Sequence, residues 1–160
     1  MNREKPMKRV VIILMCMTLL FFGTTGCSQL SQEVKQTADD LYAAKVEFVG
    51  DNAAVHALIE KTGLGRIKDY TIQLETSQEP YGLIINIAEK DGSFNESEFV
   101  PSAIQLLGLI KNLDYVEVNN GDEQFKMSSE EASALIDENV KTLGESKDKL
   151  KSIIEELTNK

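Results

Sequence analysis

The chain contains a single histidine, His56, and a carboxylate, Glu60, follows it four residues later. On a helix these two side chains lie on one face, where an imidazole and a carboxylate can share a metal ion or relay a proton. Two ligands are too few for a zinc site, and the chain has no further histidine to complete one. We therefore interpret His56 as a surface or half-buried helix residue and not as a ligand.

Neighbouring carboxylates are the second arrangement with catalytic potential, because paired acids can act as a general acid and a general base. The pairs in this chain fall in solvated stretches or at expected helix starts, which indicates charge on a wet surface. The sequence also has no Gly-x-Ser-x-Gly elbow, no glycine-rich phosphate loop and no calcium-binding loop. We predict no catalytic residue, no metal site and no cofactor. The pairs are Asp39–Asp40, Glu130–Glu131 and Glu155–Glu156.

The beginning of the chain has the layout of a secretory signal peptide. Basic residues precede an unbroken apolar run, Val10–Phe22, and small residues lead from there to Cys27. At about 1.5 Å per residue, this run is too short to cross roughly 30 Å of hydrocarbon as a helix. We predict a signal peptide over residues 1–26.

The end of this segment, Thr24-Thr25-Gly26-Cys27, resembles the lipobox of bacterial lipoproteins, with Thr24 where that motif usually has leucine. The resemblance implies cleavage between Gly26 and Cys27. It further implies a diacylglyceryl group on the Cys27 sulfur, with fatty acids such as palmitate, and a place at the outer face of the bacterial cell membrane. The alternative is an uncleaved N-terminal anchor in which Cys27 is only the last small residue.

Removal of residues 1–26 would change the charge of the chain, since they hold four of its 17 basic and one of its 26 acidic residues. The remaining formal charge of −12 leaves no basic footprint for nucleic acid and is repelled by anionic lipid head groups. Membrane association would therefore depend on the acyl chains. Cleavage would also remove Cys16, so the rest of the chain would have no pair of thiols for a disulfide.

The remaining sequence divides into a tether and one domain. Residues 27–40 are mostly polar and are predicted to tether a domain over residues 41–160, although Val34, Ala38 and Leu41 have the spacing of helical turns. In the domain, segments with helical spacing and segments with strand spacing follow in the order helix, two strands, helix, two strands and two helices. This order predicts an α+β fold with a mainly antiparallel sheet of about four strands packed with about four helices.

Local signals place these elements. The first strand pair is expected to be joined by a type I turn at Glu79-Pro80-Tyr81-Gly82, and the second by an Asn-Gly turn at Asn120-Gly121. Asp51 is an expected helix cap, Ser128 and Glu131 form an expected capping box, and Gly108 indicates close approach of another element. The expected strands are 70–75, 83–87, 115–118 and 124–127. The expected helices are 52–62, 101–113, 129–143 and 150–157.

Three stretches of the expected domain are distinctive, namely Phe48–Asn52, Gln73–Leu83 and Leu109–Leu113, which contain the sequences Val-Gly-Asp-Asn and Glu-Pro-Tyr-Gly. In these stretches the chain resembles the bacterial domain of unknown function 4825, and the resemblance covers roughly residues 41–157. Relatives of that family occur as surface lipoproteins or attached to BlaR-type membrane metallopeptidases. The resemblance therefore implies sensing at a membrane and brings no catalytic residues.

Two loops carry the candidate binding surface, because binding residues concentrate on loops. Tyr81 is the expected anchor of this surface. The alternative for both loops is that their residues only fix the backbone of turns and helix starts and contact no partner. We expect a non-enzymatic binding or sensing module for a membrane protein partner or a small ligand. The alternative is a small cell-envelope hydrolase that uses carboxylates. The candidate residues are Asp51, Asn52, Glu79, Pro80, Tyr81 and Gly82.

Overall fold

A computed structural model describes residues 37–159 of the chain. The predicted signal peptide, the cleavage site after Gly26 and the lipidation site at Cys27 lie outside the described residues. From residue 37 to residue 159, no helix is long and apolar enough to cross a membrane.

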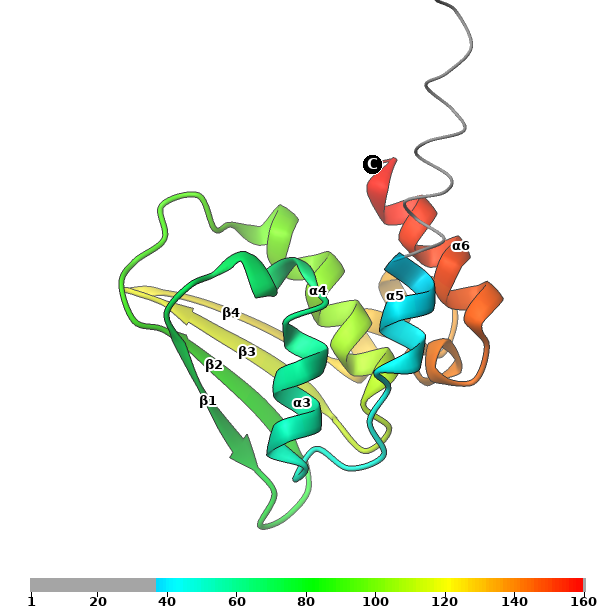
Figure 1. The fold of residues 1–160 in the computed structure, drawn as a ribbon, viewed down its shortest axis with the longest axis horizontal. Helices are drawn as coiled ribbons and strands as arrows, with labels where there is room; N and C mark the ends of the chain where they lie inside the picture. The colour runs from blue at the N-terminus through cyan, green and yellow to red at the C-terminus, as the bar shows by residue number, and fades with distance from the viewer. Residues whose placement is uncertain (1–36, 160) are drawn as a thin grey trace, which may run out of the picture. The chain divides into compact units, whose positions relative to one another are not determined.

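The described chain has the predicted α+β fold, with a four-stranded, mostly antiparallel sheet and helices (Figure 1). The strands are β1 (Tyr70–Glu75), β2 (Gly82–Ile87), β3 (Tyr115–Asn120) and β4 (Glu123–Ser128). The α-helices are a segment at 37–43, α3 (Asn52–Ile59), α4 (Glu96–Leu109), α5 (Ser129–Leu135) and α6 (Lys147–Thr158). Two 3₁₀ helices are η2 (Gly63–Arg66) and η3 (Val140–Gly144).

The sheet has the strand order β1-β2-β3-β4. Both predicted hairpins form, since β1 pairs with β2 and β3 with β4 in antiparallel fashion. The two hairpins join through a parallel pairing of β2 with β3, and α4 connects these two strands along the chain. In Figure 1, α3 and α4 lie across one face of the sheet.

Alternation along the strands separates a buried face from an open face. Leu83 and Ile85 of β2 and Val116 and Val118 of β3 are fully buried, whereas the residues between them on each strand are only partly buried. The buried side chains pack against α4, in which Leu106, Leu107 and their neighbours are also fully buried. The covered face therefore forms the core, and no described helix covers the open face.

Helix α4 begins five residues earlier than predicted and ends at Leu109 instead of 113. Pro101, expected in the first turn, lies inside the helix, because Asn95 is the cap: its side chain accepts a hydrogen bond of 2.9 Å from the N–H of Ser97. Ile110 leaves the helix and forms a parallel bridge with Val46. The apolar pattern located the helix, and a side-chain cap outside that pattern set its start.

The predicted helix 129–143 is divided into α5 and η3. The Ser128–Glu131 capping box starts α5 as predicted, but Asp137 has a positive φ of 55° and ends the helical path. Leu135, expected on the apolar face, is 52% exposed, while Val140 and Leu143 are buried. At Gly108 the predicted close approach is confirmed, because a Cβ there would lie 2.9 Å from the Leu143 side chain.

The packed part of the chain includes residues that the sequence placed in the tether. Residues 37–43 are helical, and Ala38 and Leu41 are buried in the core. Asp39 pairs with Lys147 of α6, and the hydroxyl of Tyr42 donates to the carbonyl of Glu145. Of the residues whose spacing indicated helical turns, Ala38 and Leu41 therefore belong to a helix that packs on the domain, and Val34 lies outside the described residues.

Candidate binding cleft at one end of the sheet

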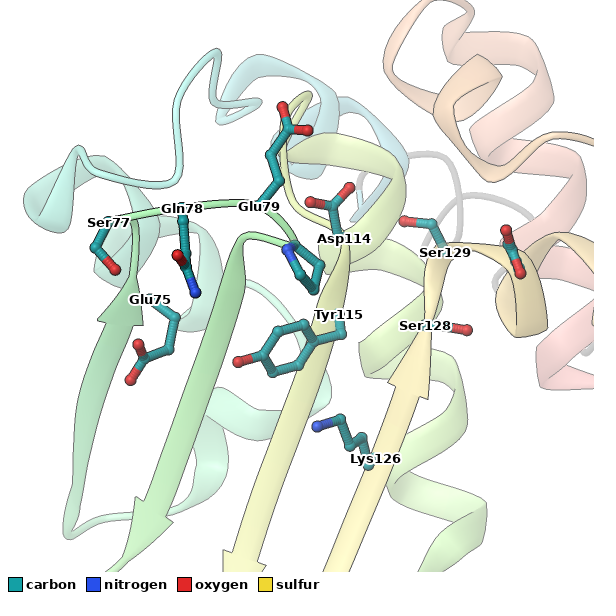
Figure 2. Close-up of a pocket in the computed structure, with 11 residues that line it drawn as sticks. Glu75, Ser77, Gln78, Glu79, Asp114, Tyr115, Lys126, Ser128 and Ser129 are labelled. Carbon is teal, nitrogen blue, oxygen red and sulfur yellow. The ribbon is translucent and has the colours of Figure 1, made fainter.

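A cleft of about 650 Å³ lies at the end of the sheet where β1 and β4 finish and β3 begins. The loop between β1 and β2 forms one wall, and the start of α5 forms the opposite wall (Figure 2). The lining residues bring four carboxylates, three serine hydroxyls and one ammonium group to a surface that is otherwise largely apolar. The lining residues are Glu75, Ser77, Gln78, Glu79, Pro80, Asp114, Tyr115, Lys126, Ser128, Ser129 and Glu130.

The floor of the cleft is the last row of side chains on the open face. Strand pairing places Glu75 opposite Gly82, Gly82 opposite Tyr115, and Tyr115 opposite Ser128. Because Gly82 has no side chain, the ring of Tyr115 lies against its Cα, in space that a Cβ would fill. Gly82 therefore has a structural reason to be glycine: it lets the aromatic ring lie flat across the sheet.

Lys126 holds its ammonium group above this ring. The Nζ atom lies 4.2 Å from the centre of the Tyr115 ring and 3.4 Å from Oε2 of Glu117. The side chain of Glu117 is only 12% exposed. Its negative charge is compensated by Lys126 and by the amide of Gln124, whose Nε2 donates to Oε1 at 3.0 Å. The aromatic face and the carboxylate together form a site for a cationic group, which the chain fills with its own lysine.

Asp114 connects the two walls of the cleft. Its carboxylate accepts a hydrogen bond of 2.6 Å from the N–H of Tyr81, and its own N–H donates to the carbonyl of Tyr81 at 2.8 Å. Its carbonyl accepts from the N–H of Ser129 at 2.8 Å. Two residues earlier, the side chain of Asn112 accepts a bond of 2.7 Å from the N–H of Val49. The segment between α4 and β3 therefore holds both of the loops that carry the candidate surface.

The six candidate residues fall into different environments. Glu79 and Pro80 are exposed and line the cleft, whereas Tyr81 is half-buried and packs against the core. Gly82 is buried as the first residue of β2. Asp51 caps α3, with its carboxylate accepting from the N–H of Ala54 at 3.1 Å, and Asn52 is the first residue of that helix. Neither of the last two lines the cleft.

The predicted type I turn at residues 79–82 does not form. Gly82 already belongs to β2, where it pairs with Glu75, so the six residues 76–81 make the connection between β1 and β2. The Glu79–Pro80 peptide bond in this connection is cis. The connection is therefore a loop with exposed side chains from Thr76 to Pro80, and not a tight turn.

His56 lies on the exposed side of α3, away from the cleft. Its ring stacks on Tyr70 with centres 5.4 Å apart, and its Nδ1 lies 3.9 Å from Oε1 of Glu60. The Tyr70 hydroxyl donates to the same oxygen at 2.6 Å, and partial burial together with this carboxylate raises the pKa of Tyr70. Over residues 37–159, no group of three histidine, cysteine, aspartate or glutamate side chains could hold a metal ion.

A second, smaller cavity of about 290 Å³ lies beside Lys141 of η3. The Lys141 ammonium donates to the carbonyls of Leu107 at 2.7 Å and Ile110 at 3.1 Å, and also to that of Leu113. Burial lowers the pKa of Lys141 to about 8, and the charge of Asp114 opposes this shift. Lys141 therefore donates to three carbonyls in the last turn of α4 and the segment after it, and this role accounts for its burial.

Several cleft residues were not among the sequence candidates, namely Asp114, Tyr115, Lys126, Ser128 and Ser129. The period-two alternation of β3 and β4 places Tyr115, Lys126 and Ser128 on one face of the sheet. The sequence therefore contained a signal that these three side chains share a face. The parallel pairing of β2 with β3 is what brings this face to the loop at 77–80, and no local signal encodes that pairing.

Comparison with known proteins gives one finding. Residues 41–132 match the family model described as Domain of unknown function (DUF4825). No curated protein and no solved structure matches the chain. The match covers more than half of the sequence and includes α3, the whole sheet and α4. The chain therefore belongs to the DUF4825 family.

Proposed function

We propose that this protein is a lipoprotein anchored through Cys27 at the outer face of the bacterial cell membrane, where it is a non-enzymatic binding or sensing module. Its binding site is the cleft at the end of the sheet. The observation that carries the proposal is the convergence of exposed loop residues, Glu79 and Pro80 among them, with Tyr115 and Lys126 around one cavity of about 650 Å³. A cavity of this size with converging polar groups is typical of a binding site.

The arrangement of the acids favours binding over catalysis. Four carboxylates line the cleft, but that of Asp114 is engaged by the N–H of Tyr81 and holds the loop in place. Oε1 of Glu75 accepts a bond from the side chain of Gln73. These two carboxylates therefore have structural partners, and such groups are better suited to shape a site than to exchange protons.

Site-specific photocrosslinking in intact cells tests the binding site. A photoreactive amino acid in place of Gln78, an exposed lining residue, is expected to crosslink to a membrane partner. The matched control carries the same group in place of Glu96, which is exposed at the start of α4 and does not line the cleft. Crosslinks of equal yield at both positions, or none at Gln78, would reject the cleft as the site of contact.

The anchor has a separate test. The Cys27→Ala variant is expected to lose fatty-acid labelling and to accumulate as a larger form that keeps its signal peptide. The unsubstituted protein is expected to incorporate labelled palmitate and to enter the detergent phase on partitioning. Equal labelling of the two proteins would show that another residue is modified.

A small cell-envelope hydrolase that uses carboxylates is the second candidate, and the two cleft acids left for it are Glu79 and Glu130. Such an enzyme would release soluble fragments from purified cell-envelope material. The Glu79→Gln and Glu130→Gln variants would abolish this release. Absence of any released fragment with the unsubstituted protein would leave binding as the function.

A further inference from the structure

The free edge of β1 carries backbone groups that no other part of the described chain uses. The N–H of Ala88 donates to the carbonyl of Asp69 at 2.9 Å, which makes these two residues a hydrogen-bonded pair. Bonded and non-bonded pairs alternate along an antiparallel ladder. Thr71, Gln73 and Glu75 therefore bond to β2, while Ile72 and Leu74 direct their N–H and C=O groups away from it.

This edge is also where the covered face of the sheet remains incomplete. Tyr70, Ile72 and Leu74 point towards the core but are only partly buried, whereas Leu83 and Ile85 beside them on β2 are fully buried. In Figure 1, β1 forms the outer edge of the sheet with no helix or strand beyond it. A further strand at this edge would cover the exposed parts of these apolar side chains.

The other edge strand, β4, differs in the side chains that it carries. It carries the charged residues Glu123 and Lys126, and lysine is a common device that prevents strand pairing at an edge. Strand β1 has no lysine, no proline and no bulge, and all of its residues pair in a regular register with β2. Of the two edges, β1 is the one suited to receive a strand.

The charge around β1 indicates the partner's composition. From Asp69 to Glu79 the chain carries three carboxylates and no basic residue, and Glu75 and Glu79 stand where the edge meets the cleft. We propose that an extended polypeptide segment of a partner pairs with the free edge of β1. Apolar side chains of the segment cover Ile72 and Leu74, and a lysine or arginine reaches Glu75 and Glu79 at the cleft. This inference rests on the proposed function, because it states what kind of partner binds at the cleft: an extended, basic polypeptide segment.

The test uses the full-length protein in detergent and a synthetic peptide, acetyl-Lys-Val-Thr-Val-Thr-Val-Lys-amide, which alternates apolar and polar residues between basic ends. Hydrogen exchange of single amides is followed by NMR. The peptide is expected to slow exchange at Ile72 and Leu74 at least tenfold and to leave Thr71 and Gln73 unchanged. A peptide with proline in place of the central valine is expected to give no protection, because it cannot complete the ladder.

Three results would overturn the proposal: no added protection at the edge, equal protection by a peptide with glutamate ends, or protection that grows with protein concentration without peptide. The last result would mean that two copies of this chain pair through β1.

The Ile72→Pro variant is expected to weaken peptide binding at least tenfold. If this variant does not fold, the two peptides decide the question with the unsubstituted protein. Crosslinking at Gln78 is independent of these measurements, so a crosslink without edge protection rejects the strand partner and leaves the binding module standing.

Discussion

The two faces of the sheet have opposite properties although they belong to the same four strands. On the covered face, aliphatic side chains such as Leu83, Ile85 and Val118 are fully buried beneath the helices. On the open face, Asn86, Glu117, Asn119 and Gln124 form a network of side-chain hydrogen bonds of 3.0–3.2 Å. Burial of apolar area stabilises the covered face. On the open face, the polar side chains form hydrogen bonds with one another, so this face needs no helix to cover it.

This difference separates stability from recognition. Changes beneath the helices are expected to alter the free energy of unfolding, because packing there is dense and voids are costly. Changes of exposed side chains on the open face and in the cleft are expected to alter binding and to leave the fold nearly intact. Gly82 is the exception, because it is buried beneath the ring of Tyr115. The following four substitutions test that separation, in decreasing order of expected effect on stability.

Leu107→Ala on α4 is expected to lower the free energy of unfolding by about 2–5 kcal/mol, because it removes a fully buried side chain and leaves a cavity. The matched control is Leu135→Ala on α5, the same change at a leucine that is 52% exposed, with an expected cost below about 0.5 kcal/mol. Denaturant unfolding measures both. Equal costs would show that burial does not separate these two leucines.

Lys141→Met is expected to cost about 1–3 kcal/mol at pH 7, because the carbonyls of Leu107, Ile110 and Leu113 lose a charged donor. The pH dependence has a definite sign. Below about pH 8 Lys141 is protonated in both states, whereas between about pH 8 and its ordinary value of 10.5 only the unfolded state keeps the proton. The free energy of unfolding of the unsubstituted protein, relative to Lys141→Met, should therefore rise with pH in this window. Unfolding curves from pH 7 to pH 10 that show a fall instead would reject the assigned burial.

Gly82→Ala probes the floor of the cleft and is expected to cost about 1–3 kcal/mol, because the new Cβ occupies space taken by the Tyr115 ring. Adding Tyr115→Ala should recover much of this cost, and a double-mutant cycle measures the coupling. Additive effects would mean that the ring can move away freely. Crosslinking from position 78 in Gly82→Ala then reports whether the displaced ring obstructs the cleft.

Asn119→Ala on the open face is expected to cost no more than about 1 kcal/mol, because its bonds to Asn86 and Glu117 are replaced by bonds to water. The melting temperature should change by only a few degrees. A loss as large as that of Leu107→Ala would mean that this face is covered in the folded protein, and the two faces would then no longer differ in kind.

Local chemistry was sufficient for a large part of the fold. Asp51, the Ser128–Glu131 capping box and Gly121, which has a φ of 65° in the second hairpin, act within a few residues of themselves, and each lies where the sequence predicted. The start of α4 was placed late because Pro101 is a common first-turn residue while Asn95 was the actual cap. Helix 129–143 was predicted unbroken because its apolar spacing continues through the backbone break at Asp137.

The candidate site was predictable only in part. Glu79 and Pro80 were identified because a loop between two strands exposes its side chains, and both line the cleft. Tyr81 was expected to be its anchor, yet it is half-buried and held through its backbone by Asp114. The contact with Asp114 joins residues 33 positions apart, so no local pattern could indicate it.

By itself, the sequence determined the four strands, the approximate places of most helices, which of their faces are apolar, and that the chain is acidic beyond its basic, apolar beginning. These properties depend on residue type and spacing over short distances. The tertiary structure alone decided that β2 lies parallel to β3, that Tyr115 rests on Gly82, and that Asp114 joins both walls of a cleft. Such contacts form between distant residues when the core closes, and their geometry depends on how all the buried side chains pack together.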